Sequence, residues 1–307
     1  MEILRALENI RNPFFDELIL LITRMEEQMI IIAVFCAIFW CINKRMAYVL
    51  GIVFFMSAIL VQGMKIIFRV DRPWVYDPSF TTVPGAVGAA TGYAFPSGHT
   101  QNAAAYLMPL GVMLNNKIVR IIMFGLALLV AFSRMYLGVH YLSDVLVSLI
   151  IVAVILWLAI KFYYNAPENN KTEALFPLII CAATIAIFAM VIIMNFAEVT
   201  EPAKLRDSVL AGGAAAGFAV GMFIEKKYIN FSVKSKNVFM QILKLILGLA
   251  GTIGIMEGAR ILGSGLVADA IRYGLTTLWI TAIYPLLIKR FLSVKGESCQ
   301  KSSEKQA

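Results

Sequence analysis

Long apolar stretches dominate this sequence and restrict the folds that it can adopt. A helix of about 20 apolar residues crosses the hydrocarbon core of a bilayer. Nine stretches approach or reach that length: residues 28–42, 46–68, 99–114, 118–135, 141–164, 173–196, 208–225, 238–258 and 267–288. Only 15% of the residues are charged, which is too few to cover a soluble protein of this size. Because lipid requires every backbone polar group to be satisfied internally, the sequence predicts an all-α, polytopic bundle of about nine transmembrane helices.

The segment that precedes these stretches has an amphipathic pattern. Within residues 14–25, Phe14, Leu18 and Leu21 share one helical face, and the charged residues lie elsewhere. This pattern predicts an N-terminal interfacial helix that lies on the membrane surface. A short helix packed against the bundle fits the same pattern equally well.

The basic residues indicate how the chain is oriented in the membrane. The net charge is +8, but no basic run is interleaved with aromatic residues, so nucleic acid is not a predicted partner. The loops after the first, third, fifth and seventh stretches, together with the C-terminal tail, carry more Lys and Arg than the opposite side. The positive-inside rule therefore predicts a cytoplasmic C-terminus and an external N-terminus. We expect an integral membrane protein that crosses the membrane several times.

The cysteines give no sign of redox or metal chemistry. Cys36, Cys41 and Cys181 lie in apolar stretches, Cys299 lies in a polar tail, and no Cys or His pair has a metal-ligand spacing. We therefore predict no cofactor and no metal site.

A polar stretch at residues 165–172 suggests how the chain is divided. It predicts a core of residues 1–165, a C-terminal transmembrane extension of residues 166–290 and a polar cytoplasmic tail of residues 291–307. In the extension, Gly213, Gly217 and Gly221 form a GxxxGxxxG row, and Gly254 and Gly258 form a second pair. Both patterns predict close helix packing.

The chain has only two histidines, His99 and His140, and each lies at the mouth of an apolar stretch on the predicted outer side. Ionisable side chains at membrane depth are costly and tend to mark functional sites. A single histidine is more often structural, but three polar segments accompany this pair.

The first segment is residues 65–73, which contain Lys65, Arg72 and Pro73. If the segment is helical, Lys65 and Arg72 share a face about 10 Å apart along the axis, and Pro73 ends or kinks the helix. Two cations could then reach one anion. A lysine and an arginine that extend toward the membrane surface would give the same pattern.

The second segment, residues 95–100, precedes the third apolar stretch and reads FPSGHT. Gly98 allows the backbone to approach a ligand closely. Ser97 and the amides that follow it, at a helix N-terminus, predict an anion site that His99 would face.

The third segment is residues 133–144. His140 and Asp144 are four residues apart, so on a helix they share a face. The carboxylate could then accept from one ring nitrogen and leave the other as a nucleophile. Arg134 adds a planar fork for phosphate oxygens. Asp144 could instead be a polar residue that is hydrogen-bonded near a helix start.

Together the three segments form the motifs K-x6-R-P, P-S-G-H and S-R-x5-H-x3-D. With these motifs, residues 14–164 resemble the type 2 phosphatidic acid phosphatase superfamily, and the extension resembles that of some bacterial members. The resemblance implies a metal-free lipid phosphatase in which His140 attacks phosphorus, Asp144 orients His140 and His99 acts as acid and base. It also implies that five residues bind the phosphate: Lys65, Arg72, Ser97, Gly98 and Arg134.

Several alternatives use the same residues. A lipid phosphotransferase would pass the phosphoryl group from His140 to another lipid, a vanadate-dependent haloperoxidase would bind vanadate, and a lipid-phosphate transporter would need no nucleophile. Nine apolar stretches favour a substrate with a long tail over a soluble one. Undecaprenyl pyrophosphate suits an outward-facing bacterial site, whereas phosphatidate, phosphatidylglycerol phosphate and sphingoid phosphates fit the same motifs.

Overall fold

The computed structural model describes residues 1–167 and 170–292, and in these ranges the chain is helical without any β-strand. The α-helices are α1 (Glu2–Asn9), α2 (Pro13–Thr23), α3 (Gln28–Ala37), α4 (Lys44–Phe68), α5 (Pro73–Tyr76), α6 (Gly98–Met113), α7 (Lys117–Tyr136), α8 (Leu142–Ala159), α9 (Asn170–Phe196), α10 (Pro202–Ile224), α11 (Val238–Gly258), α12 (Leu266–Leu278) and α13 (Tyr284–Leu287). Short 3-10 or π-helical segments are η1 (Arg24–Glu26), η2 (Ile38–Ile42), η3 (Ile160–Tyr164), η4 (Glu225–Ile229), η5 (Ala259–Leu262), η6 (Trp279–Ile283) and η7 (Ile288–Leu292).

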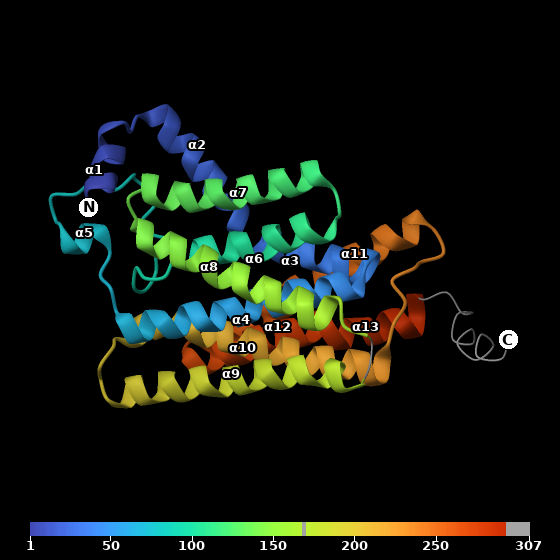
Figure 1. The fold of residues 1–307 in the computed structure, drawn as a ribbon. Helices are drawn as coiled ribbons and strands as arrows, with labels where there is room; N and C mark the ends of the chain where they lie inside the picture. The colour runs from blue at the N-terminus through green and yellow to red at the C-terminus, as the bar shows by residue number, and fades with distance from the viewer. Residues whose placement is uncertain (168–169, 293–307) are drawn as a thin grey trace.

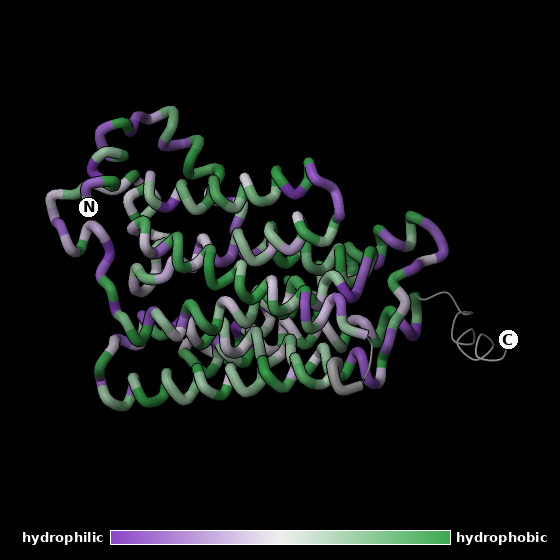
Figure 2. The backbone as a smooth tube through the Cα atoms, in the orientation of Figure 1, coloured by the Kyte–Doolittle hydropathy of each residue, from purple (hydrophilic) through white to green (hydrophobic). Residues whose placement is uncertain are grey.

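The long helices lie roughly parallel to one another, and hydrophilic residues gather toward the two ends of the bundle (Figure 1, Figure 2). Among the described residues, seven helical segments are long and apolar enough to cross a membrane. An eighth span results if Pro13–Glu26 and Gln28–Ile42, which meet at a 44° bend, count as one. Helix α6, the third predicted stretch, has 16 residues and is shorter than each of the seven segments. The all-α membrane bundle is therefore confirmed.

Helix α2 combines features of both predictions made for the N-terminal segment. It packs against α7, where the Tyr136 hydroxyl donates to Asp16 at 2.9 Å. On its other side Phe14 is 72% exposed and Leu21 is 62% exposed. The helix therefore lies on the bundle and presents an apolar face outward.

Asparagine side chains begin several helices at the end of the bundle opposite the N-terminus (Figure 1). The side chain of Asn43 accepts from the Met46 amide, and that of Asn116 accepts from two amides of α7. Each cap satisfies donors that the first helical turn leaves unpaired. Helices α4 and α7 therefore start at this end and finish at the end where the polar motifs lie.

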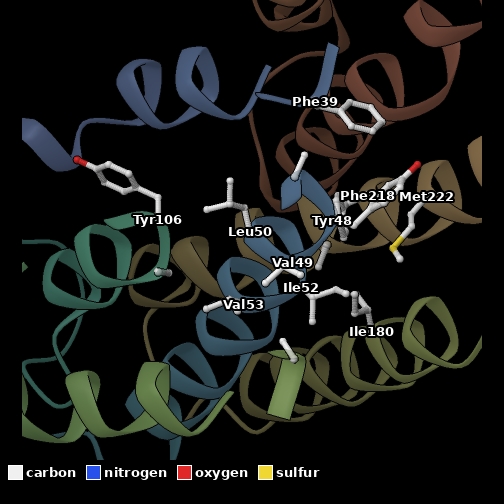
Figure 3. Packing of buried hydrophobic residues seen from close by; sticks show 14 of the residues in the cluster. Phe39, Tyr48, Val49, Leu50, Ile52, Val53, Tyr106, Ile180, Phe218 and Met222 are labelled. Atoms are coloured by element: carbon white, nitrogen blue, oxygen red, sulfur yellow. The ribbon is translucent and has the colours of Figure 1, made fainter. Parts of the chain in front are cut away.

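Helix α4 lies at the centre of the apolar core. Figure 3 shows its residues Tyr48, Val49, Ile52 and Val53 among side chains of η2, α6, α9 and α10, including Phe218. Because helices before and after residue 165 share this cluster, the predicted core and extension pack as neighbours. The division at that point stays a prediction.

The small residues of α10 allow α12 and η6 to approach it closely. A Cβ added at Gly213, Gly217 or Gly221 would collide with Ala270, Gly274 or Thr281, respectively. The predicted close packing is thus confirmed for this row. At Gly254 and Gly258 a Cβ would meet no described atom within 4 Å, so the packing prediction is wrong for that pair.

Candidate active site

The predicted site residues come together where the ends of α4, α6, α7 and α8 meet, at the same end of the bundle as the N-terminus (Figure 1). The centres of the His99 and His140 rings are 6.3 Å apart. All three motifs therefore meet in one place, although they are far apart in the chain.

The first motif departs from its predicted local structure. Helix α4 ends at Phe68, where Arg69 adopts a left-handed conformation (φ 49°), so the helix does not continue to Arg72. Arg72 is extended (φ −69°, ψ 153°), as the residue before a proline prefers, and Pro73 begins α5. The prediction of one helix over Lys65 and Arg72 was wrong, yet both cations reach the site.

Backbone carbonyls of a loop hold these two cations in place. Arg72 donates to the carbonyl oxygens of Thr91 at 2.6 Å and Gly92 at 3.3 Å, and the Lys65 ammonium donates to that of Tyr93. In turn the Thr91 hydroxyl donates to Asp207 of α10 at 2.5 Å. The extension therefore contacts the loop that positions the cations, a role that sequence analysis missed because carbonyl groups leave no residue signature.

The second motif forms the start of α6. The side chain of Ser97 accepts from the Thr100 amide at 3.3 Å, and the Ser97 amide donates to the Asp144 carbonyl at 3.1 Å. The Ser148 hydroxyl donates to the Ser97 carbonyl at 2.9 Å. These bonds join the start of α6 to α8. The first amides of α6 point out of its N-terminus at the site, an arrangement that favours anions.

The third motif places His140 in a turn before α8. Gly138 adopts φ 81°, and α8 begins only at Leu142, so the predicted helical pair of His140 and Asp144 was wrong in detail. Asp144, in the first turn of α8, nevertheless lies 3.2 Å from Nδ1 of His140 and accepts from the Tyr141 amide at 2.9 Å. Asp144 is thus both a helix cap and the partner of His140.

The hydrogen bonds of His140 determine which ring nitrogen carries the proton. Arg72 lies 2.8 Å from Nε2, and a guanidinium can only donate. Nε2 must therefore accept, which leaves the proton on Nδ1, facing Asp144. The ring thus presents an unprotonated Nε2 on the cationic side of the site.

The surroundings of His140 also favour the neutral ring. Burial lowers the pKa of His140 well below its usual value, and the charges of Arg72 and Lys65 lower it further. These surroundings therefore favour the neutral form of the His140 ring at neutral pH.

Arg134, at the end of α7, has donors left over. One of its terminal nitrogens donates to the Thr23 hydroxyl at 2.8 Å. Its Nε and its other terminal nitrogen are buried without a hydrogen-bond partner among the described residues. Buried donors are rarely left unpaired, so this pair is suited to an incoming anion.

His99 has a partner that the motifs do not contain. Its Nε2 lies 3.4 Å from a carboxylate oxygen of Glu26, in η1, and the other Glu26 oxygen accepts from Asn102 at 3.4 Å. The Glu26 side chain is mostly buried. In the sequence, an acidic residue next to an apolar stretch is the signal that could have identified it. Within residues 1–167 and 170–292, no cluster of three His, Cys, Asp or Glu side chains is arranged to hold a metal ion.

Comparisons with known proteins agree with this arrangement. Residues 46–168 match the model of the PAP2 superfamily, and residues 209–296 match the model described as PAP2 superfamily phosphatase, transmembrane extension. Undecaprenyl-diphosphatase BcrC of Bacillus subtilis (strain 168) is 28% identical over 170 residues, which is 52% of this chain and 82% of that protein. No solved structure gives a significant match. The resemblance predicted from the three motifs is confirmed.

Proposed function

Because the chain belongs to the PAP2 superfamily and is a membrane phosphatase that acts on lipids, we propose that it hydrolyses a lipid phosphate or pyrophosphate through a phosphohistidine at His140. One observation carries this proposal: Nε2 of His140 lies 2.8 Å from the Arg72 guanidinium and beside a second imidazole, while Nδ1 faces Asp144. A nucleophile oriented by a carboxylate through its other nitrogen is the arrangement that covalent catalysis requires.

In the first step, Nε2 of His140 attacks phosphorus and an N–P bond forms as the bond to the lipid oxygen breaks. His99 enters this step protonated, a form that the Glu26 carboxylate and the bound phosphate stabilise, and it gives its proton to the leaving oxygen. Asp144, bound to Nδ1, stabilises the positive ring that results. A well-placed general acid typically increases the reaction rate by a factor of about 10² to 10⁴.

In the second step, His99, now neutral, takes a proton from water, and the water oxygen attacks phosphorus. The N–P bond breaks, phosphate leaves, and His140 and protonated His99 are regenerated. One imidazole therefore serves as acid and then as base.

Lys65, Arg72 and Arg134 would bind the equatorial phosphate oxygens, together with Ser97 and the Gly98 amide. Phosphoryl transfer depends mainly on positioning and on neutralising charge, and fixed cations supply both. Phosphate binding must draw Arg72 away from Nε2, because the bond at 2.8 Å occupies the lone pair that attacks. The two unpaired donors of Arg134 are ready for the phosphate without such a change.

A long-chain prenyl diphosphate is the substrate that we propose first, because a relative is an undecaprenyl-diphosphatase. The distribution of Lys and Arg supports a site on the extracytoplasmic side of a bacterial plasma membrane. We propose a cytoplasmic C-terminus for the same reason, since the site and the C-terminal helices end at opposite ends of the bundle.

Phosphate release by the purified protein in detergent, with a chelator present, tests this proposal. Undecaprenyl pyrophosphate, phosphatidate, phosphatidylglycerol phosphate and a sphingoid phosphate would be compared, with vanadate as inhibitor. We expect release without added metal and none from His140→Ala or His99→Ala, while both variants still insert into the membrane. Normal phosphate release by His140→Ala would refute the assignment of His140 as the nucleophile. Strict dependence on a divalent metal would refute the metal-free mechanism. Formation of a newly phosphorylated lipid only when an acceptor lipid is added, without release of phosphate, would identify a transferase.

A further inference from the structure

A cavity of about 320 Å³ begins at the candidate active site and continues into the bundle. Lys65, Arg72 and His99 line its polar end. Its volume is within the range of ordinary ligand sites, at the lower end. The cavity and the phosphate site are therefore continuous.

Helix α4 gives the direction and length of this cavity. Its lining residues form a stripe from Lys65 through Gln62, Ala58 and Phe54 to Leu50. At 1.5 Å per residue, this stripe covers about 22 Å of helix axis. The cavity thus runs along α4 into the depth of the bundle, well past the reach of a phosphate group.

The facing wall belongs to the C-terminal extension. On α10 the lining residues are Asp207, Leu210, Ala211, Ala214 and Phe218, which repeat at helical spacing and form one face. Residues of α12 and η6 continue this wall: Tyr273, Thr276, Thr277, Ile280 and Thr281. The cavity therefore exists between the core and the extension, and the core alone supplies only part of its wall.

The deep part of the cavity suits a hydrocarbon chain. Phe35, Leu50, Phe55 and Phe218 lie there with other apolar side chains. The threonines of the wall do not need a polar ligand, because their hydroxyl groups donate to backbone carbonyls of α10 and α12, as Thr276 does at 2.8 Å and Thr281 at 2.6 Å. A ligand that fills this space needs an anionic head at Lys65 and an apolar tail.

We propose that this cavity binds the hydrocarbon chain of the lipid substrate, and that the extension forms one wall of the chain-binding site. The inference rests on the proposed function, since the phosphate at His140 fixes where the chain begins. The extension then contributes to the selection of substrates by chain length. Its helices α10 and α12 are packed tightly enough through their glycine row to hold a fixed wall.

The test compares a hexadecyl chain with a hexyl chain, each supplied as the monophosphate and as the diphosphate, for hydrolysis by the full-length protein in detergent. Ala211→Phe fills the cavity from the extension and Ala58→Leu fills it from α4. We expect each to lower the ratio of kcat/KM for the long chain over the short chain by roughly tenfold. An added side chain that displaces about two methylene groups of the substrate has this effect on the ratio, since each buried methylene contributes a factor of about four to binding.

Val220→Phe is the matched control, because Val220 lies on the exposed side of α10 and outside the cavity. Its ratio should equal that of the parent protein. An unchanged ratio in both cavity variants, each eluting as a monodisperse peak in gel filtration, would overturn the proposal, as would an equal loss in the control. If the parent protein hydrolysed none of these phosphates and diphosphates, the proposed function itself would fail, and this result differs from an unchanged ratio.

Discussion

Replacing Glu26 with glutamine tests whether Glu26 supports His99 as the general acid. Glu26 lies 3.4 Å from Nε2 of His99, and the change keeps the shape of the side chain while it removes the charge. Hydrogen bonds to charged groups contribute about 1.5–3 kcal/mol, which corresponds to a factor of roughly 10 to 150 in rate. Because 3.4 Å is long for such a bond, we expect a loss in kcat/KM near the lower limit.

The leaving group separates a role in acid catalysis from a role in folding. An alkyl phosphate needs a proton on its leaving oxygen, whereas p-nitrophenyl phosphate has a leaving group that departs without one. We therefore expect Glu26→Gln to lower kcat/KM for the alkyl substrate and to change it little for the aryl substrate. Glu27→Gln is the matched control, because Glu27 is 59% exposed and pairs only loosely with Arg24, at 4.0 Å. Equal losses of kcat/KM on the alkyl and aryl substrates would refute a role of Glu26 in acid catalysis. A lower KM with unchanged kcat would instead indicate that Glu26 competes with phosphate for Arg134.

Three further predictions concern the loops around the site. Asp207→Asn weakens the hydrogen bond from Thr91 and so loosens the loop that holds Arg72. In steady-state kinetics we expect KM for phosphate substrates to rise several-fold, whereas the control Glu201→Gln, at an exposed residue, should leave KM unchanged. Gly138→Ala places a Cβ within 2.8 Å of Phe80 and Arg11 at φ 81°, so we expect a lower Tm in detergent and reduced activity, whereas Gly125→Ala, with open space around it, should leave Tm unchanged or raise it. Because the pKa of His140 is depressed in the folded protein, the unfolded chain takes up a proton that the folded protein does not, so stability falls as the pH decreases below about 6.5. His140→Asn should show a smaller loss of Tm between pH 7 and pH 5, and an identical loss in both proteins would contradict the role of this histidine.

The sequence predicted the features that depend on short-range pattern. The apolar stretches locate the membrane helices because each must satisfy its own backbone within lipid. The pairing of His140 with Asp144 was predicted from their spacing of four residues. In the structure His140 lies in a turn and contacts Asp144 in the first turn of α8, because α7 ends in a turn where Gly138 has a positive φ. The residue types were thus predictable, and the backbone that carries them was predicted less well.

Contacts between distant segments had no signature of this kind. Glu26 precedes α3 and Asp207 follows a loop near residue 200, and neither belongs to a motif. Thr91, Gly92 and Tyr93 act through carbonyl oxygens, which every residue has. Near the other end of α4, the buried Glu225 bonds to Lys44 at 2.9 Å and to the Phe231 amide at 3.1 Å, and so links the extension to α4. Such contacts follow from how the helices pack, which pattern alone does not specify.

Trapping of the covalent intermediate tests the central claim most directly. The purified protein would be mixed with a lipid phosphate carrying ³²P, quenched in alkali within milliseconds, digested and analysed by mass spectrometry. We predict a phosphate that is stable in alkali, labile in acid and located on His140, with none on the His140→Ala variant. Rapid turnover with no phosphorylated peptide, or a phosphate on any residue other than His140, would contradict the account.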